Sequence, residues 1–214
     1  MRSKLFIKIL IWIPLFIIFV TILYFGGGFA LLVLLVILAM SIVEFISKVR
    51  YSNDKTYLSA FLLLYLIGLF YSIVLYHVSG LVFYKYLVII CFATVLSDVC
   101  AFFFGSYFGK HPLPKYINEK KSIEGIVGQI VGAFVGVLVV HLFIFKVSPF
   151  WIFIPIGIGS AIGDIGNSAA KRRAQIGSWS EFIPGHGGFI DRFASFSGSF
   201  VLVYISLNIS GILR

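Results

Sequence analysis

Residues 123–145 read IEGIVGQIVGAFVGVLVVHLFIF, an apolar run with a single acidic residue near its start. The run is long enough to cross the hydrocarbon core of a bilayer, which takes about 20 predominantly apolar residues in a helix. Gly128, Gly132 and Gly136 recur every four residues and therefore share one helix face. Rows of small residues let helix backbones approach each other closely in lipid. The stretch thus predicts a transmembrane helix that packs tightly against its neighbours.

The whole chain has the composition of a polytopic membrane protein. Of its 214 residues, 60% are hydrophobic and 12% are charged, with a mean hydropathy of +1.07, whereas soluble domains are about 25% charged. This composition argues against a soluble or a disordered chain. We expect an all-α fold, a polytopic bundle of about seven transmembrane helices. The expected spans are Leu5–Phe25, Phe29–Ile46, Tyr57–Tyr76, Tyr84–Phe108, Ile123–Phe145, Phe150–Ile165 and Phe189–Ile212.

The positions of Lys and Arg predict the orientation of the bundle. With the N-terminus in the cytoplasm, fourteen of the 17 basic residues fall on the cytoplasmic side, as the positive-inside rule requires. An odd number of spans then places the C-terminus outside. The longest polar loops also fall on the cytoplasmic side, so we expect the chemistry of the protein to face the cytoplasm. These loops are Tyr51–Lys55, Gly109–Ser122 and Asn167–Gly188.

We expect one membrane domain, in which residues 1–80 form N-terminal transmembrane helices and residues 81–214 form a catalytic core. The net charge of +9 is explained by basic loops that set topology and attract anionic lipid heads and nucleotide phosphates. We therefore expect membrane lipids, and no nucleic acid, as partners. The chain shows no targeting tail, which favours a bacterial inner (plasma) membrane. A homodimer is left open.

Three carboxylates lie within or at the ends of the expected spans, all in the cytoplasmic half of the bundle: Asp98, Asp164 and Asp191. A charged side chain at the centre of a spanning helix costs roughly 2.5–3.5 kcal/mol on insertion scales, and such residues are usually functional. Each could instead be a structural partner of a Lys or Arg. Because the three gather beside two basic loops, we favour a shared polar site.

A stripe of polar residues continues from Asp164. Ser168 and Lys171 follow it at i+4 and i+7, so they share one helix face if the helix extends past the membrane edge, and Arg172 borders them. A carboxylate, a hydroxyl and cations along one helix suit a phosphate ligand that carries a metal. The alternative is a basic helix end that only marks topology.

The sequence PGHGG at residues 184–188 predicts a phosphate-binding loop. Gly185, Gly187 and Gly188 permit backbone conformations in which several amide groups point inward together. Such nests bind phosphate oxygens, and a helix N-terminus beside them adds a favourable dipole. His186 could donate to a phosphate or, as a less favoured role, act as an acid or a base.

Two charged residues follow this loop at the start of the last expected span. Asp191 could hold Mg²⁺, which takes carboxylates together with substrate phosphates. Arg192 offers a planar fork to phosphate oxygens. The simpler alternative is a glycine-rich turn with a capping Asp.

A second basic loop precedes the run at residues 123–145. Lys120, Lys121 and Ser122 come directly before Glu124 and Gly125 at the start of that run. Clustered lysines could bind the phosphates of a nucleotide or of an anionic lipid, and Glu124 could cap the helix start. The alternative is a positive patch that only sets topology.

Three blocks of the sequence resemble motifs of phosphatidate cytidylyltransferases, the integral-membrane CDP-diacylglycerol synthases. Residues 97–111, SDVCAFFFGSYFGKH, are similar to the family element D-x-x-A-Y-x-x-G-x-x-x-G-K-H. Residues 118–125, NEKKSIEG, are similar to its element S-P-K-K-T-W-E-G. Residues 163–192, from GDIGNSAAKRR to IPGHGGFIDR, follow its signature.

The resemblance implies a reaction in which CTP and phosphatidic acid, or a related lipid phosphate, give CDP-diacylglycerol and pyrophosphate. It implies Mg²⁺ as the cofactor, held by Asp164 and Asp191, with a second cation left open. The implied catalytic residues are Asp164, Asp191, Lys171, Arg172 and His186. The expected substrate-binding residues are Asp98, Lys120, Lys121, Ser122, Glu124, Gly125, Ser168, Gly185, Gly187, Gly188 and Arg192.

The sequence also departs from the family pattern. Gly177 and Ser178 stand where the family has a Lys-Asp pair, and Asn118 begins the pair that replaces Ser-Pro. Ala194 stands where the family has the last Asp of D-R-x-D. A metal ligand or proton acceptor of the family is therefore absent, which keeps a catalytically impaired lipid-binding homologue as an alternative.

Two other functions compete with the cytidylyltransferase interpretation. A CTP-dependent lipid kinase of the polyprenol type has distantly similar membrane motifs, but the intact PGHGG-x-x-DR sequence favours a cytidylyltransferase. A transporter is disfavoured because the polar residues gather towards one face of the membrane instead of following a path through it.

Overall fold

The computed structural model of the protein describes residues 27–49, 54–79, 82–118, 121–182 and 187–212. Helices make up the regular structure of these residues, apart from one isolated bridge between Pro112 and Ser122. The expected all-α fold is thus confirmed for the described part of the chain. The helices are α2 (Gly27–Val49), α3 (Lys55–Ser79), α4 (Val82–Phe108), α5 (Ile123–Phe143), η1 (Phe150–Ile152), α6 (Phe153–Arg173) and α7 (Phe189–Ile209).

The expected number of seven spans is corrected to five among the described residues. The helices long and apolar enough to cross a membrane are α2, α4, α5, α6 with η1, and α7, and they indicate an integral membrane protein. The apolar segment identified in α3, Lys55–Phe70, is shorter. The helix itself continues to Ser79 and has 25 residues in all. The expected span Leu5–Phe25 lies outside the described residues.

Helix α6 continues past Ile165, the expected end of its span, as far as Arg173. Its last turn holds three basic residues, which interact favourably with the negative end of the helix dipole. Gln175 follows the helix with a φ of 56°, in the left-handed region that commonly ends helices. The stripe from Asp164 to Lys171 therefore lies on one helix face, as expected if the helix extended.

Close backbone contacts hold α4 against α5. A Cβ atom added to Gly136 would lie 2.5 Å from the Cα of Ala93, and one added to Gly132 would lie 2.7 Å from the Cα of Ser97. Such separations are closer than real Cβ atoms approach. The row of glycines in α5 therefore packs against α4 in the way that its spacing predicted.

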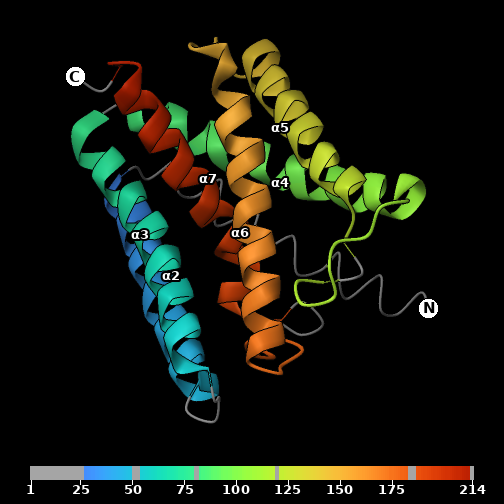
Figure 1. The fold of residues 1–214 in the computed structure, drawn as a ribbon. Helices are drawn as coiled ribbons and strands as arrows, with labels where there is room; N and C mark the ends of the chain where they lie inside the picture. Colours follow the sequence, from blue (N-terminus) through green and yellow to red (C-terminus); the bar gives the residue numbers. More distant parts are fainter. Residues whose placement is uncertain (1–26, 50–53, 80–81, 119–120, 183–186, 213–214) are drawn as a thin grey trace.

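The remaining helices complete the bundle around α6. Figure 1 shows α2 and α3 side by side on one flank of α6, with α5 on the other flank. One hydrophobic core joins α4, α5, α6 and α7, and a second joins α2 and α3 to the first turns of α7. The second core surrounds Trp179, which is fully buried and stacks on Phe45 and Phe61 with ring centroids 5.7 and 6.1 Å away.

We expect the substitution Gly136→Val to destabilise the protein, because its side chain would overlap the backbone of Ala93. Overpacking of this kind typically costs about 1–3 kcal/mol. The matched control is Gly177→Val, since nothing lies within 4 Å of a Cβ at position 177. Thermal unfolding of both variants in the same detergent measures the difference, and equal midpoints would show that α4 and α5 can separate without cost.

Candidate active site

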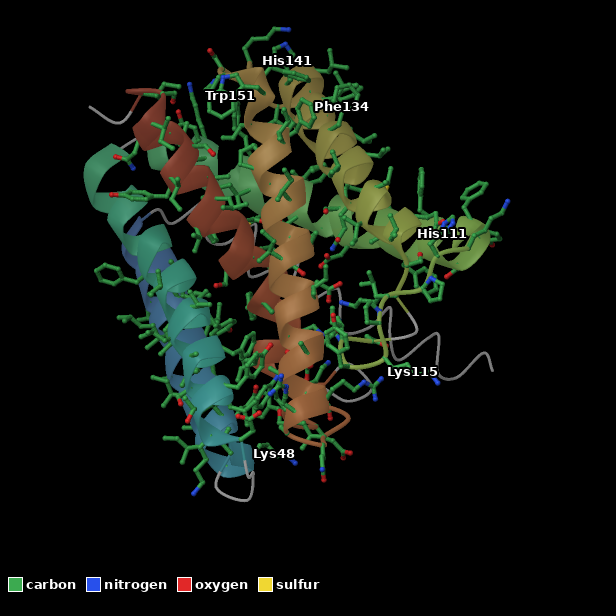
Figure 2. The ribbon with its side chains drawn as sticks, viewed as in Figure 1. Lys48, His111, Lys115, Phe134, His141 and Trp151 are labelled. Carbon is green, nitrogen blue, oxygen red and sulfur yellow. The ribbon has the colours of Figure 1, made fainter. Side chains whose placement is uncertain are left out.

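The polar loops of the described chain gather at one end of the bundle. Figure 2 shows Lys48, at the end of α2, and Lys115, between α4 and α5, towards the C-terminal end of α6. His141 and Trp151 lie at the opposite end. Two parts of the chain that are far apart in the sequence thus meet near the end of α6: the loop before α5, and the segment that runs from the loop after α6 into the start of α7.

Asp164 of α6 binds Lys121, which lies in the loop before α5. The Lys121 Nζ is 2.5 Å from the Asp164 Oδ2 and donates to the Asp164 backbone carbonyl at 2.8 Å. Burial lowers the pKa of Lys121, and the charge of the adjacent Asp164 carboxylate opposes that shift. The Asp164 side chain is nevertheless 37% exposed. This pair joins the second basic loop to the acidic stripe of α6, two features that the sequence placed in one site.

Asp191, in the first turn of α7, is the most completely surrounded carboxylate of the site. Its Oδ1 lies 2.6 Å from the Lys171 Nζ and accepts from the Asn167 side-chain amide at 3.4 Å. Its Oδ2 accepts from the backbone amides of Trp179 and Gly188, at 3.0 and 3.1 Å. The side chain is 4% exposed. Since a carboxylate has about four acceptor positions, these donors leave little of its capacity unused.

Asp98 lies deeper, among polar side chains of three other helices. Its Oδ1 accepts from the Ser160 hydroxyl at 3.1 Å, and Ser195 and Gln129 also hydrogen-bond to its side chain. The carboxylate is close enough to Asp164 for the two charges to interact. The structure thus brings Asp98 to the inner side of the same polar cluster, as the sequence predicted.

The start of α5 is held by its own side chains. Ser122 is the N-cap and accepts from the Gly125 amide at 3.2 Å. Glu124 binds the His111 Nδ1 at 2.6 Å and its backbone amide at 3.3 Å. The cap predicted for Glu124 is thus made by Ser122, although Glu124 still lies in the first turn. Together with the bridge from Pro112 to Ser122, these bonds fix the loop that carries Lys121.

Other predicted residues occupy the rim of the cluster. Ser168 is buried on α6, and Arg172 is exposed beside it, where its guanidinium donates to the Asn118 side chain at 3.4 Å. Arg192 is half-buried in the first turn of α7. Among the departures from the family pattern, Ala194 is 3% exposed in the core around Trp179.

The glycine loop is described only at its end. Gly187 has a φ of 80°, a conformation that favours glycine, and Gly188 is the N-cap of α7. Three further predicted residues lie outside the described residues: Lys120, Gly185 and His186.

Sequence reasoning missed Glu44 of α2, which it did not include in the site. The Glu44 side chain is buried and accepts from the Ser180 hydroxyl at 2.6 Å and from the amides of Phe189 and Ile190 at 2.9 and 3.1 Å. A signal was present, because Glu44 is the one acidic residue of the expected span Phe29–Ile46. Trp179, whose indole donates to Asn167 at 2.7 Å, was also missed.

The two predicted metal ligands differ in how well they suit a cation. Among the described residues, no three His, Cys, Asp or Glu side chains form a group that could hold a metal ion. Mg²⁺ needs only one or two carboxylates where substrate phosphates complete its shell. Asp164 fits that requirement because its carboxylate is partly exposed. Asp191 is less accessible, because a metal would have to displace its present donors.

Part of the chain is similar to proteins named phosphatidate cytidylyltransferase. A phosphatidate cytidylyltransferase of Mycobacterium bovis is 34% identical over 121 residues, 55% of this chain and 39% of that protein. One of Staphylococcus saprophyticus is 34% identical over 116 residues, 52% of this chain and 44% of that protein. One of Aquifex aeolicus is 32% identical over 163 residues, 73% of this chain and 59% of that protein. The chain thus spans between 39% and 59% of the length of these relatives.

A sequence model described as the cytidylyltransferase family matches residues 4–210, nearly the whole chain. The resemblance seen in the three sequence blocks is thereby confirmed, and it extends over the N-terminal helices as well. The chain belongs to the cytidylyltransferase family.

Proposed function

We propose that the protein is a membrane cytidylyltransferase that uses CTP and a lipid phosphate, with phosphatidic acid as the first candidate, to make a CDP-lipid and pyrophosphate. Family membership and the names of the relatives support this reaction. The observation that carries it is the bond between Lys121 and Asp164, which sets a cation and an accessible carboxylate side by side. A nucleotide triphosphate with its divalent cation needs both kinds of group.

The proposed reaction needs no side chain as a nucleophile. An oxygen of the lipid phosphate attacks the α-phosphorus of CTP, and a new P–O bond forms there. The bond between the α-phosphorus and the oxygen bridging to the β-phosphorus breaks, and the electron pair leaves with pyrophosphate. Catalysis of such transfers rests on positioning and on stabilising the charge that develops on the phosphate oxygens.

We propose that cationic side chains of the cluster bind those oxygens. Lys121 of the loop before α5 contacts Asp164 of α6, Arg172 is exposed at the end of α6, and Arg192 is half-buried in the first turn of α7. An ammonium or guanidinium group donates strong, charge-assisted hydrogen bonds to phosphate. In our proposal Lys121 exchanges Asp164 for a nucleotide phosphate when the substrate binds, with Arg172 and Arg192 beside it. His186 and the glycines at 185–188 stay predicted contributors.

Members of the family generally use Mg²⁺, and Asp164 is the described residue best placed to hold it. Bound there with the nucleotide phosphates, Mg²⁺ would supply charge neutralisation for the leaving pyrophosphate. We assign Asp191 a different part, which is to hold Lys171 and the backbone around the glycine loop in place. A direct metal contact of Asp191 remains a prediction.

The proposed setting of the site is the cytoplasmic face of a bacterial inner membrane. Five apolar helices and the bacterial origin of the relatives support this setting. The orientation rests on the distribution of basic residues, since Lys48, Lys115 and the basic last turn of α6 lie at the end of the bundle that holds the candidate site.

Product analysis with labelled CTP tests the reaction. Purified protein with Mg²⁺ and phosphatidic acid should transfer the label of [α-³²P]CTP, but not that of [γ-³²P]CTP, into the lipid fraction, because the β and γ phosphates leave together. Transfer of the γ label would identify a lipid kinase. Transfer of neither label from a panel of lipid phosphates would favour the impaired homologue.

We expect Asp164→Asn to lower kcat/KM for CTP by on the order of 100-fold or more, the usual effect of removing one group that stabilises transition-state charge. The variant should also need more Mg²⁺ for half-maximal rate. Asp54→Asn is the matched control, because Asp54 pairs with Arg173 at the same end of the bundle, 2.7 Å apart. Its rate should stay within about twofold of wild type, since exposed pairs contribute about 0–1 kcal/mol. Equal rates for both variants would contradict the role of Asp164.

The two lysines should differ in what their loss does to stability. Lys171→Met leaves the buried Asp191 without its cation, which should cost about 3–5 kcal/mol. Lys121→Met frees a carboxylate that is already partly exposed, so the loss of stability should be about 1 kcal/mol or less, although activity should fall strongly. Unfolding in detergent and CTP turnover are measured on the same preparations. A larger loss of stability in Lys121→Met than in Lys171→Met would reverse the assignment.

A further inference from the structure

Glu44 is a buried carboxylate that belongs to α2, yet its partners lie in the C-terminal part of the chain. Its Oε1 accepts from the Ser180 hydroxyl and the Phe189 amide, and its Oε2 accepts from the Ile190 amide. The partners are up to 146 residues away in the sequence. A carboxylate at 5% exposure in an apolar helix is costly unless such donors surround it.

These donors lie on both sides of the glycine loop. Ser180 precedes the PGHGG sequence and Phe189 follows it, so one side chain ties the two ends of that segment together. The neighbour of Glu44 makes a parallel contact, because Phe45 stacks on Trp179 with ring centroids 5.7 Å apart. Glu44 and Phe45 of α2 therefore contact Ser180 and Trp179, two adjacent residues of the loop after α6.

Glu44 also contacts the backbone at Gly188, where a residue with a side chain would not fit. A Cβ atom at Gly188 would overlap the Glu44 carboxylate, so the loop and α2 are in direct contact at this point. The first amides of a helix lack intrahelical partners. In α7 the Gly188 amide donates to Asp191, and the amides of Phe189 and Ile190 donate to Glu44. In this arrangement those amides are engaged by protein carboxylates.

We infer that Glu44 is a positioning residue of the active site: it sets Ser180 and the first turn of α7, which flank the glycine loop, against Lys171 of α6. It acts through the loop and does not touch the substrate. The inference rests on the proposed function for its catalytic consequence. The structural part is that Glu44 holds Ser180, Phe189 and Ile190 together, an arrangement that we call the clamp. It does not depend on which reaction the site performs.

The clamp is tested without substrate by hydrogen exchange of the backbone amides in residues 187–190. We expect Glu44→Ala to speed exchange there by about tenfold or more, since charge-assisted hydrogen bonds protect these amides. Ser41→Ala is the matched control. Ser41 is buried one turn earlier in α2 and bonds to the Tyr65 hydroxyl at 2.9 Å, away from the loop. Exchange that is unchanged in Glu44→Ala, or equally raised in Ser41→Ala, would overturn the clamp.

The catalytic consequence is tested by kinetics on the same variants. Glu44→Ala should raise KM for CTP and lower kcat, with kcat/KM at least tenfold below that of Ser41→Ala. Glu44→Gln should recover part of the loss, because its amide oxygen can still accept from α7. Raised exchange with kinetics equal to those of Ser41→Ala would overturn the positioning role. A wild-type protein that transfers no cytidylyl group would refute the proposed function, while the exchange experiment would still decide on the clamp.

Discussion

The site depends on one physical constraint: two carboxylates are buried at the first turn of α7, Asp191 within the turn and Glu44 of α2 against it, and each has to find donors within the protein. Asp191 takes two backbone amides, a side-chain amide and the Lys171 ammonium. Glu44 takes a hydroxyl and two further amides. Because an unpaired buried charge is very costly, these bonds draw α2, α6, α7 and the loop before α7 into one arrangement.

The degree of burial distinguishes two lysine–aspartate pairs that look alike in the sequence. Lys121 and Lys171 each pair with an aspartate, but the Asp164 side chain is 37% exposed and that of Asp191 is 4% exposed. A partly hydrated pair can exchange its partner for a phosphate or a metal at modest cost. Breaking a buried pair costs much more free energy, because it leaves an unpaired charge inside the protein. In our proposal the partly exposed pair therefore meets the substrate, and the buried pair holds the loop before α7 in place.

The same constraint changes how the N-terminal helices are understood. Residues 1–80 were expected to supply spans and residues 81–214 the chemistry, yet α2 contributes a carboxylate to the loop before α7 and an aromatic ring to the core around Trp179. The family match over residues 4–210 agrees with one continuous unit. In the described chain, the helices before residue 80 thus take part in building the site.

The sequence by itself determined the helical membrane fold, the close contact along the glycine row of α5, the family and most members of the polar cluster, including Asp98, Asp164 and Lys171. These follow from local properties, namely the length of apolar runs, a four-residue spacing and short motifs. The tertiary structure alone decided which donors each carboxylate binds, and it revealed Glu44. Lys121 and Asp164 are 43 residues apart, and Glu44 and Phe189 are 145 apart. Pairings across such separations arise from the packing of helices, which no local pattern encodes, and burial then sets the energy of each pair.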